Sequence, residues 1–161
     1  MGDGKYMEYF KRLARKLKIN KNISFLGWVP QSQLHKHIQV GDIGYSYMPN
    51  ELTIKACSSM KVFQYMQFGA VPLVSNVGDF PKYTFNGKAG YIANHSDVTA
   101  LASTLLTALS RKNDRKNKIA YAIEHAKKKY KWSVLANKTE NIYKKIGMNY
   151  KNQGRDTRAD F

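Results

Sequence analysis

Hydrophobic positions in residues 58–75 change from a helical spacing to a continuous apolar run, which predicts a helix followed by a buried strand. Gly69 is expected to end the helix, because glycine readily adopts the left-handed conformation. Pro72 lies in the apolar run and suits a strand at the start of its ladder. Ser58 and Ser59 precede the helix and can cap its first turn. A helix followed by a strand in this way can present the helix N-terminus to a ligand. An ordinary βαβ fragment without a ligand would show the same pattern of hydrophobic positions.

The other hydrophobic spacings predict further helices and strands in alternation. Helical spacing predicts helices over residues 5–18, after Pro30, after Asp97 as a cap, and at about 114–129 and 132–146. Short apolar runs predict strands at 23–27, 42–47 and 90–93. Such an alternation gives an α/β fold, here a Rossmann-like, mostly parallel sheet with helices on both faces. Ligands of these sheets bind outside the carboxyl ends of the strands.

The length of 161 residues suits one domain with a sizeable core, which we place at residues 1–148. Residues 149–161 lack apolar periodicity and are expected to form a disordered tail. No apolar run reaches the roughly 20 residues that span a bilayer, and no leader pattern opens the chain. Cys57 is the single cysteine and fits a reducing compartment. We therefore expect a cytoplasmic protein, with peripheral membrane attachment as an option.

The formal net charge of +16 is concentrated toward the two ends of the chain. Residues 23–110 carry five basic and four acidic side chains, so the excess lies outside the unit at 58–75. Such a charge favours anionic partners, either nucleic acid or a membrane surface. None of the short nucleic-acid-binding signatures occurs, so nucleic acid is not an expected partner. An anionic membrane surface and solvated basic faces without a partner both remain open.

Two helix starts are candidates for anion binding. Glycines at Gly2 and Gly4 could let backbone amides approach a phosphate, although a plain tight turn explains them equally well. Residues 58–60 lie at a second helix start, where Lys61 could add a positive charge or simply face solvent. Gln64, one turn further on, could hydrogen-bond a sugar hydroxyl through its amide.

Side chains for catalysis or metal binding do not cluster in the sequence. No Ser/His/Asp set, Cys/His pair or pair of acids has a plausible spacing, so no catalytic residue is assigned. His35 and His37 are two residues apart and would diverge on a helix, while His95 and His125 are isolated. No metal site is expected from these spacings.

Five short motifs occur in an informative order. They are Gly2-x-Gly4, the segment ISFLGWVP at 23–30, Asp42-Ile43-Gly44, KVFQYM at 61–66 with Gly69-x-x-Pro72, and Tyr130-Lys131-Trp132. In this order they resemble the C-terminal half of retaining GT-B glycosyltransferases of the family-4, or group 1, type, which transfer sugars from nucleotide donors. The resemblance covers about residues 2–146. It implies a GT-B C-terminal domain that lacks its first strand.

The resemblance also implies a site for a nucleotide-diphosphate sugar as substrate, with no cofactor and no metal. The implied donor-binding residues are Gly2, Gly4, Phe25, Leu26, Gly27, Ser58, Ser59, Met60, Lys61 and Gln64. The two N-terminal glycines would approach the diphosphate, and the loop at 25–27 would face the base. Amides of Ser59 and Met60 would reach the phosphate or sugar, and Gln64 the ribose. Helix dipoles and basic groups would stabilise the leaving diphosphate.

Two departures from the resembled family bear on activity. The family's Glu-x7-Glu pair falls on Ala56 and Gln64, and we expect the chain to lack the N-terminal domain that binds the acceptor in this family. The expected function is therefore the donor-binding part of a hexosyltransferase-type enzyme acting on a glycan or lipid-linked acceptor. It would be a fragment or one half of a split enzyme, completed by an acceptor domain in cis or in trans. The alternatives are a non-catalytic pseudo-enzyme, or a basic binding module at an anionic membrane surface or nucleic acid.

Overall fold

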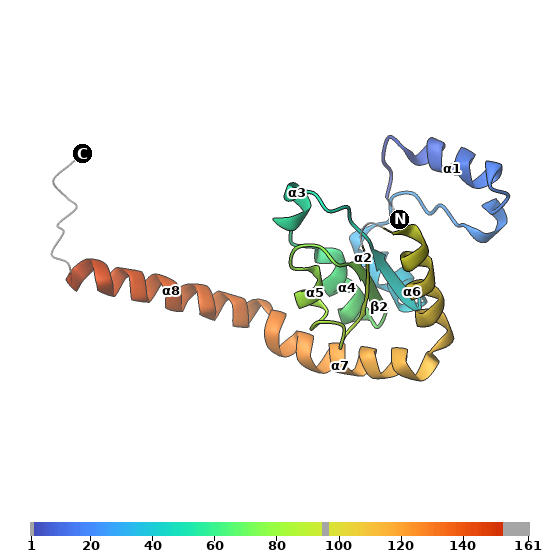
Figure 1. Ribbon diagram of the computed structural model, residues 1–161. Helices are drawn as coiled ribbons and strands as arrows, with labels where there is room; N and C mark the ends of the chain where they lie inside the picture. The colour runs from blue at the N-terminus through green and yellow to red at the C-terminus, as the bar shows by residue number, and fades with distance from the viewer. Residues whose placement is uncertain (1, 95–96, 153–161) are drawn as a thin grey trace.

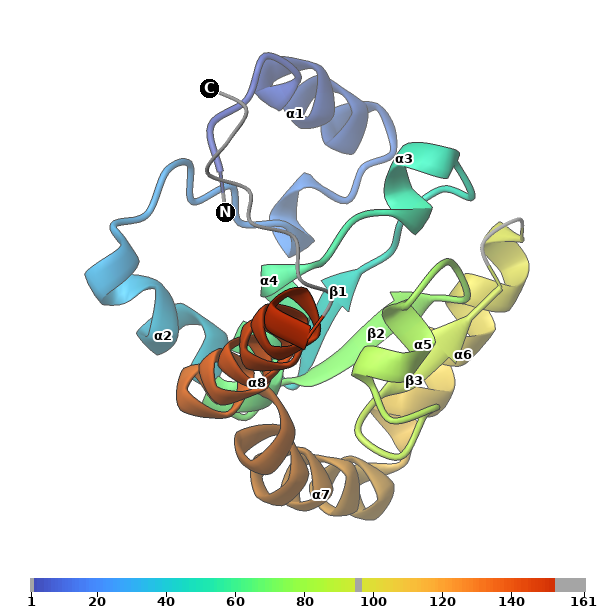
Figure 2. The ribbon, with the colours of Figure 1, turned by 90° about the vertical axis from the view of Figure 1, so that its left-hand side faces the viewer.

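A three-stranded parallel sheet forms the centre of the protein in the computed structural model, which describes residues 2–94 and 97–152. The strands follow the order β1 (Ile43–Ser46), β2 (Val71–Ser75) and β3 (Tyr91–Ala93). Ile43 is opposite Val71 in the first pair, and Leu73 is opposite Tyr91 in the second. The carboxyl ends of all three strands consequently lie at one edge of the sheet (Figure 2).

Helices cover both faces of this sheet. Their bounds are α1 (Met7–Lys16), α2 (Gln31–Gln39), α3 (Leu52–Lys55), α4 (Met60–Phe68), α5 (Phe80–Tyr83), α6 (Val98–Ser110), α7 (Lys112–Tyr130) and α8 (Trp132–Asn152), with a short 3-10 helix at Asn20–Asn22. α4 lies against one face and α6 against the other, while α7 contacts both helices. The predicted α/β class, a parallel sheet with helices on both faces, is confirmed.

The core is divided into two clusters by the alternation of side chains along β2. Val71 and Leu73 point to the side of α6, where they pack with residues that include Ala108. Val74 points to the other side and packs with Val62 and Met66 of α4. Because both faces are covered, all five residues of β2 are buried. This double coverage explains why the strand appears in the sequence as an unbroken apolar run.

Pro72 is accommodated in the central strand by its position. The first pair between β2 and β3 joins Leu73 and Tyr91, so Pro72 precedes that ladder. The missing N–H of a proline at this position therefore removes no hydrogen bond from the ladder between β2 and β3. Gly90 passes so close that a Cβ on it would lie 2.6 Å from the carbonyl oxygen of Pro72.

Much of α1 and α8 lies away from this core. Figure 1 shows α1 and α8 at opposite ends of the molecule, with α8 extending as a long rod beyond α7. Tyr6, Phe10 and Leu17 remain exposed at or beside α1, although their spacing predicted an apolar face. No helix in the described part of the chain is long and apolar enough to cross a membrane.

Two predictions about elements are wrong. Residues 23–27 are not a strand, because they pair with no strand of the sheet, and Ile23 and Leu26 are exposed. The helix predicted at about 132–146 does not end there, because α8 continues without a break to Asn152 and so extends into the segment 149–161 that was predicted as a tail. Residues 153–161 of that tail lie outside the described residues. The remaining helices and strands are confirmed within a few residues of their predicted bounds.

Candidate functional site

Polar contacts join the three strands at their carboxyl edge. The Ser75 hydroxyl at the end of β2 accepts a hydrogen bond from the Met48 amide, at 2.7 Å. The Tyr47 hydroxyl donates to the carbonyl of Asn94, just after β3, at 3.0 Å. The segment after β1 is thereby held against the ends of both other strands. This edge is where ligands of open parallel sheets bind.

The N-terminus of α4 lies at the same edge. Ser59, the N-cap residue, is buried, and its hydroxyl lies 3.4 Å from the hydroxyl of Ser46 at the end of β1. The predicted capping by Ser58 and Ser59 is wrong, because the N-cap makes no side-chain hydrogen bond to the helix. The hydroxyl of Ser59 is directed to the strand instead. The first amides of α4 are thus left without a side-chain cap, in the positive field of the helix N-terminus.

Side chains suited to a polar ligand follow on the first turns of α4. Met60 is 57% exposed, Lys61 is exposed and Gln64 is half-buried. Neither the Lys61 ammonium nor the Gln64 amide makes a hydrogen bond within the described residues. α4 therefore presents free backbone amides, one cation and one carboxamide on consecutive turns. Such a set can bind a phosphate and a neighbouring hydroxyl.

Tyr65 fixes the position of α4 on the sheet. Its ring lies directly over Gly44 of β1, where a Cβ would come within 2.1 Å of the ring. Its hydroxyl donates to the carbonyl of Tyr45, at 3.1 Å. Burial raises the pKa of Tyr65, so the hydroxyl remains a protonated donor at neutral pH. At the other end, Gly69 ends the helix in the left-handed conformation, as predicted.

The structure brings the two N-terminal predicted segments together. The Gly2 amide donates to the Gly27 carbonyl at 2.6 Å, and the Gly4 carbonyl accepts from Met7 at the start of α1. Gly2 and Gly27 both have positive φ, which favours glycine at these positions. The neighbouring Phe25 and Leu26 are exposed. No hydrogen bond between described residues joins this pair of loops to the residues of α4.

The segment before α4 contains no acid at the position that the family pattern would fill. Ala56 is the exposed C-cap residue of α3, and Cys57 and Ser58 are exposed after it. The loop after β2 passes close to the end of α3, since a Cβ at Gly78 would lie 2.8 Å from the Lys55 carbonyl oxygen. Within the described ranges, no group of three or more His, Cys, Asp or Glu side chains could hold a metal ion.

Sequence reasoning missed the serines and aromatic residues that organise this edge. Ser46 and Ser75 are the last residues of β1 and β2, and a serine near the end of two neighbouring strands was the available signal. It also missed a cavity of about 500 Å3 beside the α4 N-terminus. That cavity is lined mainly by apolar and aromatic side chains from α4, α5, α7 and α8, among them Met60, Phe63, Tyr83, Tyr130, Trp132 and Leu135.

Two longer solved structures have a similar fold. The chain is similar to sucrose-phosphate synthase from Thermosynechococcus elongatus, with 16% identity and a TM-score of 0.70 over 88% of this chain and 34% of that one. It is equally similar to a glycosyltransferase from Rickettsia africae ESF-5, with 16% identity and a TM-score of 0.71 over 88% and 36%. The chain thus spans about a third of the length of these structures.

Sequence comparison identifies the family. No curated protein sequence matches the chain. The family model for glycosyl transferases group 1 matches residues 1–125, which include the Gly2 and Gly27 loops, the sheet and all of α4. This match covers most of the chain and agrees with the fold of the two solved structures. The chain belongs to the glycosyl transferases group 1 family.

Proposed function

We propose that this chain binds the nucleotide-diphosphate sugar donor of a glycosyltransferase. The observation that carries the proposal is the uncapped N-terminus of α4 at the carboxyl edge of the sheet, in a chain of this family. Helix N-termini bind phosphate through their free amides and their positive field. The proposal assigns the diphosphate or the attached sugar to the amides of Ser59 and Met60.

The other candidate residues support the same ligand. Lys61 supplies a cation for the diphosphate, and Gln64 a hydrogen bond for a ribose hydroxyl. The Gly2 and Gly27 loops leave open space at their Cα atoms, which lets backbone amides approach a phosphate closely. Phe25 and Leu26 offer exposed apolar surface for the base. The donor would lie between these loops and the start of α4.

Transfer requires an acceptor as well as a donor. We assign acceptor binding to a further domain, carried by the same polypeptide or by a separate protein. The length comparison supports this assignment, since the chain spans about a third of the two solved glycosyltransferase-fold structures. In such an assembly this chain would stabilise the leaving diphosphate through the α4 amides and Lys61.

Thermal unfolding in the presence of nucleotides tests donor binding. UDP, GDP and ADP, with their sugar conjugates, would each be added to the full chain. A ligand at about a hundred times its Kd should raise the Tm by about 5 °C or more, because it binds only the folded state. An unchanged Tm with every nucleotide at saturating concentration would refute donor binding by this chain.

A pair of charge reversals locates the ligand. Lys61→Glu places a negative charge beside the proposed diphosphate but suits the first turn of a helix, so folding should be unaffected. We expect it to raise the Kd about tenfold or more, equivalent to about 1.4 kcal/mol. Lys88→Glu is the matched control, because Lys88 is exposed in the turn before β3 and outside the site. Equal weakening by both variants would place the ligand elsewhere.

A non-catalytic donor-binding protein is the second candidate, and the residues at 56 and 64 favour it. The family's acid pair corresponds to Ala56 and Gln64, so neither carboxylate is present. The double variant Ala56→Glu/Gln64→Glu would restore both acids. Gain of donor-sugar hydrolysis or transfer would indicate a chain that has lost activity through these two positions. If the double variant gains no activity and binds the donor as before, the loss of these two acids would not explain the absence of catalysis, and a binding role would be favoured.

A further inference from the structure

Ser59 has the residue type and the backbone of a helix cap, yet it does not cap α4. Its φ of −92° and ψ of 104° are extended, as at most N-cap positions. Within α4, all of which the structure describes, its side chain makes no hydrogen bond. A serine in this setting normally accepts from an amide two or three residues further on, here Lys61 or Val62. A contact outside the helix therefore holds the hydroxyl away.

Ser46, the last residue of β1, makes this contact. The two serine Oγ atoms lie 3.4 Å apart, and both residues are buried, with 3% of Ser46 and 7% of Ser59 exposed. Ser46 is opposite Val74 in the ladder between β1 and β2, so the sheet fixes its position. α4 is attached to the same strand, because the Tyr65 hydroxyl donates to the Tyr45 carbonyl. The two hydroxyls consequently face each other between β1 and α4.

The Ser59 hydroxyl would turn to the helix if Ser46 did not face it. A buried hydroxyl without a partner is costly, and the uncapped first amides of α4 are the nearest free donors. A capping hydroxyl lies across the end of the helix, which is also where an oxygen of a bound phosphate would lie. The hydroxyl and the phosphate would then compete for one place.

We propose that Ser46 is a positioning residue, which keeps the end of α4 free for the donor by drawing the Ser59 hydroxyl away. The inference rests on the proposed function, which assigns the donor's phosphate or sugar to the first amides of α4. Ser46 is buried and acts through Ser59. The chain thus lacks the stability that a cap would add, and it retains an anion site in the same place.

A cycle of four chains tests the proposal. They are the unchanged chain, Ser46→Ala, Ser59→Ala and the double variant Ser46→Ala/Ser59→Ala, each titrated with UDP, GDP and ADP by calorimetry. Ser46→Ala should raise the Kd of a bound nucleotide about fivefold, because the nucleotide must displace the Ser59 hydroxyl. Fivefold equals about 1 kcal/mol, the typical contribution of a cap. Ser59→Ala and the double variant should bind like the unchanged chain, since neither has a hydroxyl that competes.

Thermal unfolding without nucleotide gives a second readout, which a merely structural role of Ser46 would not produce. Ser46→Ala should have a Tm about 2–4 °C above that of the double variant, because only Ser46→Ala retains a capping hydroxyl. Weaker nucleotide binding would therefore accompany higher stability. The loss of an ordinary structural contact would instead lower both.

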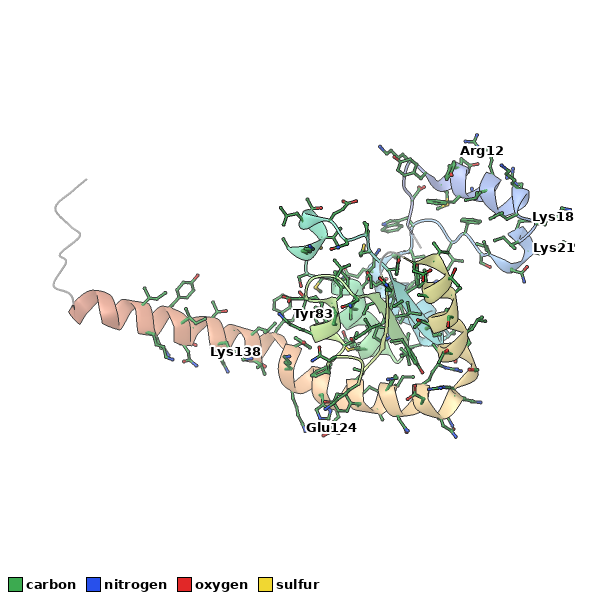
Figure 3. The ribbon with its side chains drawn as sticks, viewed as in Figure 1. Arg12, Lys18, Lys21, Tyr83, Glu124 and Lys138 are labelled. Atoms are coloured by element: carbon green, nitrogen blue, oxygen red, sulfur yellow. The ribbon has the colours of Figure 1, made fainter. Side chains whose placement is uncertain are left out.

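Thr84→Val is the matched control. Thr84 is completely buried at the end of α5, and its hydroxyl donates to the Pro81 carbonyl at 3.0 Å. Removal of this hydroxyl should leave the nucleotide Kd unchanged. All these substitutions are neutral, so any attraction of nucleotides to cations elsewhere is the same in every chain. Figure 3 shows three such cations, Arg12, Lys18 and Lys138, at the two ends of the molecule.

The outcomes separate this inference from donor binding. If no nucleotide binds any of the four chains, donor binding is refuted together with the role of Ser46. Equal Kd values for the unchanged chain and Ser46→Ala would leave donor binding intact and refute the role of Ser46. Binding by the double variant as weak as that of Ser46→Ala would also refute it, because Ser59 would not be the competitor. A Tm of Ser46→Ala below that of the double variant would refute it as well, because Ser59 would not cap the helix.

Discussion

The β2–α4 unit and the end helices α1 and α8 contain similar apolar side chains in contrasting environments. Leu73 of β2 is completely buried, whereas Leu17 at the end of α1 is 57% exposed. α4 contacts strands on one side and α7 on another, while most of α8 extends beyond its contact with α7. The fold is therefore maintained by the unit that also carries the candidate site. The end helices leave more of their apolar side chains exposed.

The largest expected effect is that of a cavity in the central strand. Leu73→Ala should lower the free energy of unfolding by about 2–5 kcal/mol, because it removes a fully buried side chain. Leu17→Ala is the matched change at an end helix and should cost less than about 1 kcal/mol. Urea denaturation of both variants measures the difference. Similar losses would show that α1 contributes to the same cooperative core.

A smaller effect is expected where α7 is tied to the core. The buried Arg115 guanidinium donates to the carbonyls of Ala108 and Leu109 at the end of α6, and to the Asp42 carboxylate at 3.1 Å. Arg115→Met leaves these acceptors without their donor and should cost about 1–3 kcal/mol. Lys116→Met removes the same charge from an exposed position, and denaturation should show little change. A similar loss of unfolding free energy in both variants would mean that the change in net charge alone causes the effect.

The pH dependence of stability tests the burial of Tyr91 and its hydrogen bond to Asp114. Burial, and then the hydrogen bond to Asp114 at 2.6 Å, raises the pKa of Tyr91 to about 12 from its ordinary 10.0. Since the folded-state pKa is raised, the contribution is complete below about pH 10 and is lost as the pH rises toward 12. Tyr91→Phe should remove this part of the alkaline decline in the free energy of unfolding. An unchanged alkaline decline in Tyr91→Phe would contradict this assignment.

The smallest effect is expected on α8 itself. Ile142→Ala should change the free energy of unfolding by less than about 0.5 kcal/mol, because the side chain makes no core contact. Thermal denaturation measures it. A loss of unfolding free energy above about 1 kcal/mol would mean that the Ile142 side chain is covered in solution.

Local chemistry made much of the fold predictable. Gly69 is a left-handed helix end, and the Asp97 side chain accepts from the Thr99 amide at 2.7 Å, both as their positions predicted. Such signals depend on the backbone of a few neighbouring residues, so they can be recognised from one sequence. The α4–β2 unit was predictable for this reason.

Tertiary contacts decided the features that could not be predicted. Residues 23–27 have the composition of a strand, but a strand forms only with a partner, and pairing is not encoded locally. Ser59 has the properties of a cap, yet its hydroxyl is directed to Ser46, thirteen positions earlier in the chain. The apolar spacing of α1 and α8 predicted helices but not whether their faces would be covered. The predicted donor contacts of the α4 residues and of the Gly2 and Gly27 loops remain predictions.

The reactivity of Cys57 tests donor binding at the α4 N-terminus most directly. It is the single cysteine, it is exposed, and it lies two residues before the N-cap Ser59. The rate of its reaction with a thiol reagent would be measured with UDP-, GDP- and ADP-sugars. We expect that one nucleotide sugar slows the reaction several-fold, and that Lys61→Glu reduces the protection. An unchanged rate with all three at saturating concentration would contradict it.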